Sequence, residues 1–183
     1  IVVGTGDMSE LALGFTTYNG DHMSMYSVNS GVPKTLVREL ISWFINYNSS
    51  DKKINETLKD IMDTPVSPEL LPPSQKGEIN QKTEEIIGSY VLNDFYLYNM
   101  LYCGYSPKKI IYLAENAFKD IYTKKELISR LREFYKRFFT QQFKRRCVPD
   151  GPKVTMLSLS PRSNLHLPAD SSYNAWLRQL DEE

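Results

Sequence analysis

The strongest constraint on the fold comes from the start of the chain, where an apolar run ends in a small-residue turn. Residues 1–3 are Ile-Val-Val, and residues 4–6 are Gly-Thr-Gly. A continuous apolar run that stops at glycines is typical of a buried strand in a parallel sheet. Asp7 or Ser9 can cap the helix that we expect over residues 10–17. The pattern predicts an α/β fold in which a parallel strand leads into a helix.

Most of the remaining chain shows helical periodicity. A short strand is expected over residues 25–28. Helices are expected over residues 33–47, 54–62, 90–102, 106–118, 124–143 and 173–180. The helix over residues 33–47 carries one apolar stripe, and the helix over residues 90–102 is apolar on nearly every side, which indicates burial in the domain or in a subunit interface. We therefore expect a mostly helical portion of an α/β domain, with few parallel strands.

Length and charge exclude several classes of protein. The 183 residues suffice for one ordinary domain, with 22 basic and 22 acidic residues. This even balance provides no long-range electrostatic attraction for nucleic acid. No apolar run is long enough for a membrane span. Cys103 and Cys147 cannot form a secreted disulfide framework, so we expect a cytoplasmic protein with reduced thiols. Because the chain has no initiator methionine and begins in a strand-like run, we expect it to be part of a longer polypeptide.

Residues 63–89 differ in composition from the helices on either side. They contain four prolines and a polar stretch with few apolar residues. Such a segment is typical of a long, mobile loop, which is either a functional lid or a plain linker. We accordingly divide the chain into residues 1–62, which carry a ligand crevice, the loop, and a helical region over residues 90–183.

Two groups near the N-terminus are candidates for binding a nucleotide. In the first, Thr5 can donate its hydroxyl to a phosphate or to adenine, and Glu10 can bind Mg²⁺ or accept from a ribose. The glycines of this turn are also explained by backbone geometry alone. In the second, Lys34 lies in the first turn of a helix, where the helix dipole disfavours a cation. It either meets an anion such as phosphate or simply reaches water. The basic cluster Phe-Lys-Arg-Arg at residues 143–146 closes a long helix, where the dipole favours positive charge without any ligand.

Several segments together carry a resemblance to a known family. They are residues 4–15, 18–24, 29–36, 63–70, 90–95, 142–145, 149–154 and 159–162. The chain resembles the C-terminal part of the ATP-dependent, amide-forming domain of glutamine-dependent NAD synthetases of the long form. This resemblance implies a Rossmann-like adenine nucleotide hydrolase fold of the N-type ATP pyrophosphatase kind. That family uses a Ser-Gly-Gly-x-x-Ser loop for pyrophosphate, and no such motif occurs here. We therefore expect the chain alone to be inactive.

The resemblance also implies roles for individual residues. Thr5 and Lys34 match residues that contact ATP, and Thr64 is a weaker candidate for the same role. The family has a lysine near the substrate where Lys144 stands.

Two further positions match the acidic residues of the family. Glu10 matches a glutamate assigned to magnesium or to deamido-NAD, and Asp21 an aspartate that contacts deamido-NAD. Tyr18 and Phe143 replace a lysine and a histidine of the short synthetases, so the substrate site of the short form does not transfer directly.

The implied reaction is the amidation of deamido-NAD to NAD by a ligase. The nicotinate carboxylate attacks the α-phosphorus of ATP to give an adenylate, and ammonia then displaces AMP, with Mg²⁺ as the cofactor. Ammonia would come from glutamine through an N-terminal nitrilase-like glutaminase domain, and a homo-oligomer is expected. The alternatives are a GMP-synthetase-like pyrophosphatase of the same fold, and a folded subdomain that serves only in oligomerisation.

Overall fold

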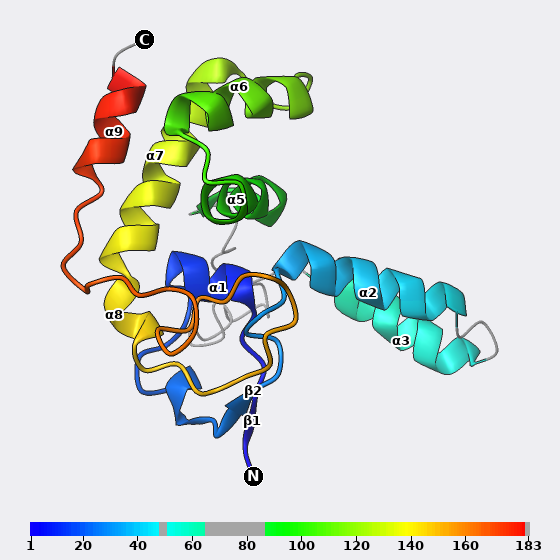
Figure 1. Ribbon diagram of the computed structural model, residues 1–183. Helices are drawn as coiled ribbons and strands as arrows, with labels where there is room; N and C mark the ends of the chain where they lie inside the picture. The colour runs from blue at the N-terminus through cyan, green and yellow to red at the C-terminus, as the bar shows by residue number, and fades with distance from the viewer. Residues whose placement is uncertain (48–50, 65–86, 182–183) are drawn as a thin grey trace, which may run out of the picture.

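The computed structural model describes residues 1–47, 51–64 and 87–181, in which helices predominate (Figure 1). The loop predicted over residues 63–89 falls largely outside these described residues. Within them, no helix is both long and apolar enough to cross a membrane. The elements are β1 (Val3–Gly4), α1 (Met8–Leu13), η1 (Asp21–Met23), β2 (Tyr26–Ser27), α2 (Lys34–Tyr47), α3 (Lys52–Asp63), α5 (Tyr90–Leu97), η2 (Tyr98–Tyr102), α6 (Pro107–Ala117), α7 (Lys124–Thr140), α8 (Gln142–Arg145) and α9 (Asn174–Asp181).

The predicted strand-turn-helix unit is present at the N-terminus, but the strand is not buried in the described structure, since Val3 is 49% exposed. β1 pairs in parallel with β2, and Val3 lies opposite Tyr26. The helix α1 begins earlier than the sequence indicated because Asp7, in extended conformation, is its N-cap. It also ends earlier, at Gly14, whose φ of 72° is left-handed. A Cβ at Gly14 would lie 2.3 Å from Gln141, so both the backbone and the packing require glycine here.

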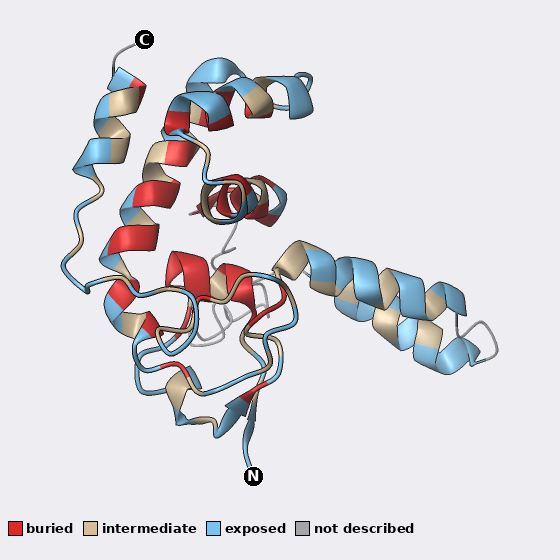
Figure 2. Ribbon diagram, viewed as in Figure 1, coloured by how far each residue is buried: buried red, intermediate tan, exposed pale blue. Residues whose placement is uncertain are grey.

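The hydrophobic core lies between α1 and the later helices. Figure 2 shows buried residues concentrated on α1, α5, α6 and α7, and α9 runs beside α7 in Figure 1. The apolar face of α7 supplies six of these buried residues: Leu127, Leu131, Phe134, Tyr135, Phe138 and Phe139. The helix predicted over residues 90–102 is α5 continued by η2, a turn of π-helix. The helix predicted over residues 124–143 is divided into α7 and α8 at Gln141.

A buried arginine joins α1 to the last helices. Arg145 is completely buried. Its guanidinium donates to the carbonyls of Leu11 and Ala12 at 3.0 and 2.9 Å, to the side-chain oxygen of Gln142 at 2.7 Å and to the carbonyl of Phe138. Burial lowers the pKa of Arg145 to about 9, so it remains protonated at neutral pH. Because it binds carbonyls near the ends of α1 and α7, the cation meets the negative ends of two helix dipoles.

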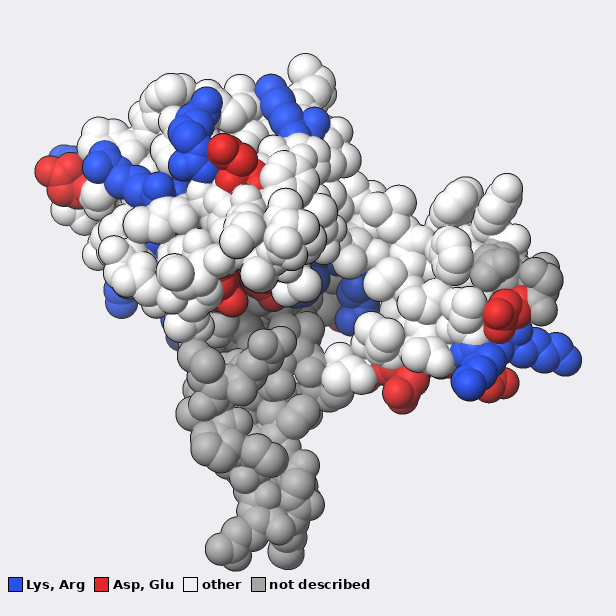
Figure 3. All heavy atoms as spheres, turned by 90° about the horizontal axis from the view of Figure 1, so that it is seen from below, with Lys and Arg blue, Asp and Glu red and all other residues white. Residues whose placement is uncertain are grey.

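The helices α2 and α3 form an arm that leads away from the core (Figure 1). They pack on one another, but neither has a fully buried residue. The expected apolar stripe of α2 is present but only partly covered by described residues: Val37, Ile41 and Ile45 are half-buried. Leu36, Leu40 and Phe44 remain 37%, 51% and 41% exposed. Basic and acidic side chains are interspersed on the arm and on the body in the face shown in Figure 3.

Candidate functional site

Lys34 is held between two carboxylates at the start of α1 and α2. Its Nζ lies 2.6 Å from Asp7 Oδ2 and 2.9 Å from Glu10 Oε1. Asp7 and Glu10 also form the capping box of α1, in which each side chain accepts from the other's backbone N–H. The Nζ lies 5.0 Å from the ring centroid of Tyr90 as well, within range of a cation–π contact. The lysine thus overcomes the unfavourable dipole of its own helix by meeting anions of α1.

Asp94 of α5 fixes the start of α2. Its Oδ2 accepts from the backbone N–H of Thr35 at 3.0 Å and from the Thr35 hydroxyl at 2.8 Å. Its Oδ1 accepts from the Ser9 hydroxyl, and Ser9 Oγ in turn accepts from the backbone N–H of Lys34 at 2.8 Å. A carboxylate at a helix N-terminus satisfies free N–H groups and is stabilised by the dipole. The core helix α5 therefore determines where α2 begins and where Lys34 lies.

Burial is the main influence on the titration of this cluster. It raises the pKa of Asp7 and of Glu10, and the nearby Lys34 opposes the rise at both. The pKa of Asp94 is likewise raised by burial, with its hydrogen bonds acting in the opposite direction. For Lys34, burial lowers the pKa, but the two carboxylates prevail and raise it. Lys34 is therefore a firmly protonated cation at neutral pH.

A pocket of about 200 Å³ lies at the carboxyl end of β1. Its walls are the turn after β1, the η1 segment, and the chain at Val148 and Pro149. Thr5 and Asp21 both line it, and a Cβ at Gly6 would have only Glu10 Oε2, at 3.8 Å, nearby. The carboxyl end of a parallel strand is the usual position for a nucleotide crevice in α/β folds. The pocket is thus adjacent to the ion cluster of Lys34, Asp7 and Glu10, which we call the Lys34 cluster, and Gly6 lies between the two.

Two glycines allow distant segments to meet beside this pocket. A Cβ at Gly31 would lie 2.8 Å from the carbonyl oxygen of Pro152, and one at Gly151 would lie 2.1 Å from that of Ser27. The backbone N–H of Ser27 also donates to the Asp150 carbonyl at 2.8 Å. The segments 29–36 and 149–154, which carry part of the sequence resemblance, are therefore packed on one another.

Lys144 lies behind the pocket. Its Nζ donates to the carbonyls of Gly14 and Thr16 at 2.6 and 2.9 Å, and burial lowers its pKa. Thr16 itself lines the pocket. In the described structure Lys144 thus fixes the backbone that follows α1. The neighbouring Phe143 has its ring centroid 5.9 Å from that of Tyr18, so the two positions that depart from the short synthetases are in contact.

The structure brings some of the candidate residues together and leaves one apart. Glu10 and Lys34 form an ion pair, and Thr5 and Asp21 share the pocket. Thr64 is exposed at the end of α3, and its hydroxyl donates within its own helix to the Asp60 carbonyl at 2.8 Å.

Sequence reasoning missed three polar residues of this region. Asp7 was considered only as a helix cap, although it binds Lys34. Asp94 was overlooked within an aromatic helix, where a carboxylate among apolar residues was the available signal. His22 lines the pocket, and no pattern in the sequence singled it out.

The chain is similar in sequence to several glutamine-dependent NAD(+) synthetases. It is 42% identical to that of Mycobacterium bovis and 40% identical to that of Mycobacterium leprae, over 202 aligned residues that include the whole chain. It is 30% identical to that of Acinetobacter baylyi over 164 residues. The chain spans about 30% of the length of the mycobacterial relatives. No family model matches it.

A solved structure shows the same fold. The crystal structure of a glutamine-dependent NAD(+) synthetase from Cytophaga hutchinsonii superimposes with a TM-score of 0.68 and 20% identity, over 98% of this chain and 26% of that one. The expected α/β fold class is confirmed. The sequence comparisons confirm the resemblance to glutamine-dependent NAD synthetases along the whole chain.

Proposed function

We propose that this chain is part of a glutamine-dependent NAD synthetase, and that it forms the nucleotide crevice in which deamido-NAD is amidated at the expense of ATP. The observation that carries the proposal is the Lys34 cluster at the carboxyl end of β1, in a chain 40–42% identical to such synthetases over its full length. Lys34 is a protonated cation next to a strand-end pocket, and with Mg²⁺ held by Asp7 and Glu10 it would be available to bind a phosphate group.

The proposed chemistry divides between the ion cluster and the pocket. The nicotinate carboxylate attacks the α-phosphorus of ATP, and pyrophosphate leaves as the adenylate forms. Lys34 would neutralise charge on the departing pyrophosphate, which is the dominant contribution in such displacements. Thr5 would contact ATP, while Asp21 and Lys144 would hold deamido-NAD. We propose Thr64 only as a secondary ATP contact, because its hydroxyl is engaged in its own helix.

The carboxylates of the Lys34 cluster are suitable ligands for Mg²⁺. Mg²⁺ is commonly held by one or two carboxylates together with substrate phosphates. The Asp7 and Glu10 carboxylates converge on one ammonium, at 2.6 and 2.9 Å. No group of three or more metal-ligating side chains occurs among the described residues, so these residues would supply two carboxylates at most. The ion would polarise the phosphate oxygens of bound ATP.

Several wider features of the enzyme follow from the same proposal. Ammonia would come from glutamine through a nitrilase-like glutaminase domain of the same polypeptide. The enzyme would be a cytoplasmic homo-oligomer, in keeping with the free cysteines and the partly exposed apolar face of α2.

The experiment that tests this function is Lys34→Ala in the full-length enzyme, assayed with glutamine and with free ammonia. Loss of one phosphate-binding cation is expected to lower kcat/KM by about 10²–10³-fold with either nitrogen source. Lys119→Ala, which changes an exposed lysine of the helical body, serves as the matched control and is expected to be neutral. A loss confined to glutamine would assign Lys34 to nitrogen transfer instead of adenylation.

A further inference from the structure

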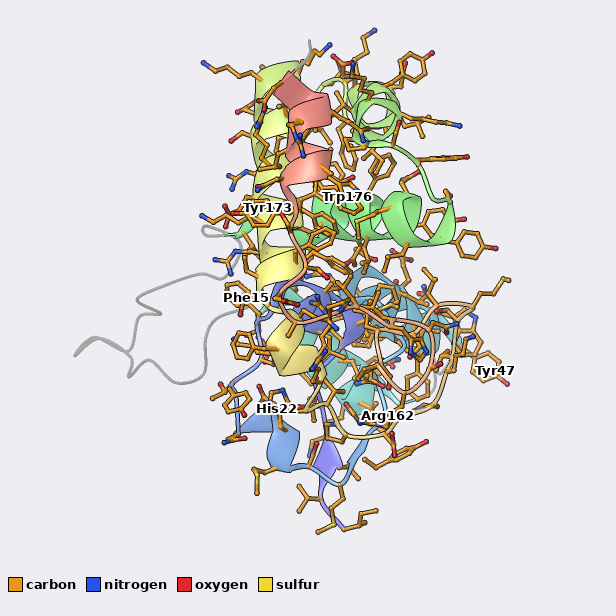
Figure 4. All side chains as sticks on the ribbon, turned by 60° about the vertical axis from the view of Figure 1, so that its left-hand side comes forward. Phe15, His22, Tyr47, Arg162, Tyr173 and Trp176 are labelled. Atoms are coloured by element: carbon orange, nitrogen blue, oxygen red, sulfur yellow. The ribbon has the colours of Figure 1, made fainter. Side chains whose placement is uncertain are left out.

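The pocket at the end of β1 contains a histidine that the proposed chemistry does not use. His22 belongs to η1, which lies below α8 in Figure 4. It lines the pocket together with Asp21 and Thr16.

Two contacts hold the imidazole of His22 in one orientation. Its Nδ1 accepts from the backbone N–H of Asn19 at 3.2 Å. Asn19 has a φ of 57°, in the left-handed region that asparagine tolerates better than most residues. The ring of Tyr18 meets the imidazole edge-on, with centroids 5.7 Å apart and planes at 79°. These neighbours therefore fix the orientation of the His22 imidazole before any ligand binds.

The same contacts determine which nitrogen of His22 carries hydrogen. Burial lowers the pKa of His22, and Lys144 adds to this, although Asp21 opposes it. The imidazole is therefore neutral at physiological pH. Because Nδ1 accepts a hydrogen bond, the single proton resides on Nε2, which is a donor.

This donor is buried and has no hydrogen-bond partner among the residues that the structure describes. The hydroxyl of Thr16, which lines the same pocket, is in the same situation. Buried polar groups without partners are rare in proteins. Two on one small pocket indicate that the pocket receives a polar group that can accept from Nε2–H.

Besides the hydroxyls of Thr5, Ser24 and Ser27, the pocket is lined by one imidazole donor, the unpartnered Thr16 hydroxyl and one carboxylate. The carboxylate of Asp21 accepts from the backbone N–H of Thr17 at 2.5 Å through Oδ2, and this bond fixes its position. A carboxylate beside a neutral donor is suited to a vicinal diol, because a hydroxyl can donate to the former and accept from the latter. About 200 Å³ accommodates one sugar or one ring and not a whole dinucleotide.

We propose that His22 is a substrate-binding residue whose Nε2–H donates to a ribose hydroxyl oxygen of the dinucleotide, while Asp21 accepts from the same ribose. This inference rests on the proposed function, because it assumes that deamido-NAD is the ligand. The inference adds a residue that contacts the sugar to the residues proposed to contact the phosphates.

The test uses the full-length enzyme and calorimetric titration with deamido-NAD in the absence of ATP. His22→Phe keeps an aromatic ring beside Tyr18 but removes the donor, and it is expected to raise Kd about 10-fold. His22→Gln supplies an amide donor and is expected to recover most of the affinity. His166→Phe, the same change at the exposed second histidine, is expected to leave Kd unchanged. The Kd of ATP is expected to stay the same in all three variants.

Dinucleotide analogues separate binding from structural effects. Wild-type enzyme is expected to bind one of two analogues, each lacking both hydroxyls of one ribose, about 10-fold more weakly than deamido-NAD. For His22→Phe the same analogue and deamido-NAD should bind alike. The inference is overturned if wild type binds both analogues as tightly as the parent, if His22→Phe binds deamido-NAD normally, or if that variant loses ATP affinity equally. Failure of wild type to bind deamido-NAD at all would instead overturn the proposed function.

Discussion

The helices α2 and α7 have similar amphipathic sequences but lie in different surroundings. Six residues of α7 are buried among α1, α5, α6 and α9, whereas α2 has no fully buried residue. The parallel pair β1–β2 resembles α2, because Val2, Val3 and Tyr26 remain 56%, 49% and 38% exposed. Parallel strands are normally covered on both faces. The comparison shows that periodicity identifies the apolar face of a helix but does not tell what covers it.

The largest effect expected from this comparison is at matched leucines. Leu131 in α7 is completely buried, and Leu40 in α2 is 51% exposed. Leu131→Ala should lower the free energy of unfolding of the chain by about 2–5 kcal/mol, because it removes buried contacts and leaves a cavity. Leu40→Ala should change it by about 0.5 kcal/mol or less. Urea unfolding of both variants measures the difference, and equal losses would mean that α2 is covered like α7.

A second prediction concerns the link between α1 and the helical body. Arg145→Met leaves the carbonyls of Leu11 and Ala12 without their buried donor, so we expect a loss of about 3 kcal/mol. Arg146→Met alters an exposed neighbour and should be within about 0.5 kcal/mol of wild type. Thermal or urea unfolding gives both values. Similar values for the two variants would show that the buried guanidinium does not join these helices.

The smallest effect expected is a pH dependence at Asp94, which links α5 to α2. Burial raises its pKa above the ordinary value of 3.8. The folded chain therefore binds more protons than the unfolded chain between 3.8 and the raised pKa, so the contribution of Asp94 to stability falls as pH rises through this window.

The substitution Asp94→Asn removes that titration. The stability of wild type relative to the variant should therefore fall between pH 3.5 and pH 7. Urea unfolding at the two pH values measures it. A difference that grew with pH would mean that the hydrogen bonds from Ser9 and Thr35 outweigh burial.

Local patterns predicted much of the fold from the sequence. The turn after β1 and the helices α6 and α7 were recognisable because each depends on residues close in the chain. The early end of α1 was not predicted, since it depends on Gly14 packing against Gln141.

The candidate site was predictable to a smaller extent. Lys34 stood out because it opposes a helix dipole, and its partner Glu10 was found in the same turn as Thr5. Asp94 lies 60 residues from Lys34 along the chain, and its role depends on tertiary packing of α5 on α2. The orphaned nitrogen of His22 is likewise visible only in three dimensions.

The central claim is that nucleotides bind where β1, α1 and α2 meet, and that the helical body serves as the scaffold. Hydrogen exchange of the full-length enzyme, with and without ATP and deamido-NAD, tests this most directly. Ligands should slow exchange in residues 3–13 and 31–35, where backbone N–H groups border the pocket and the Lys34 cluster, and leave α7 unchanged. Slowed exchange in α6, α7 and α9 with none at residues 3–13 would contradict the assignment of the crevice.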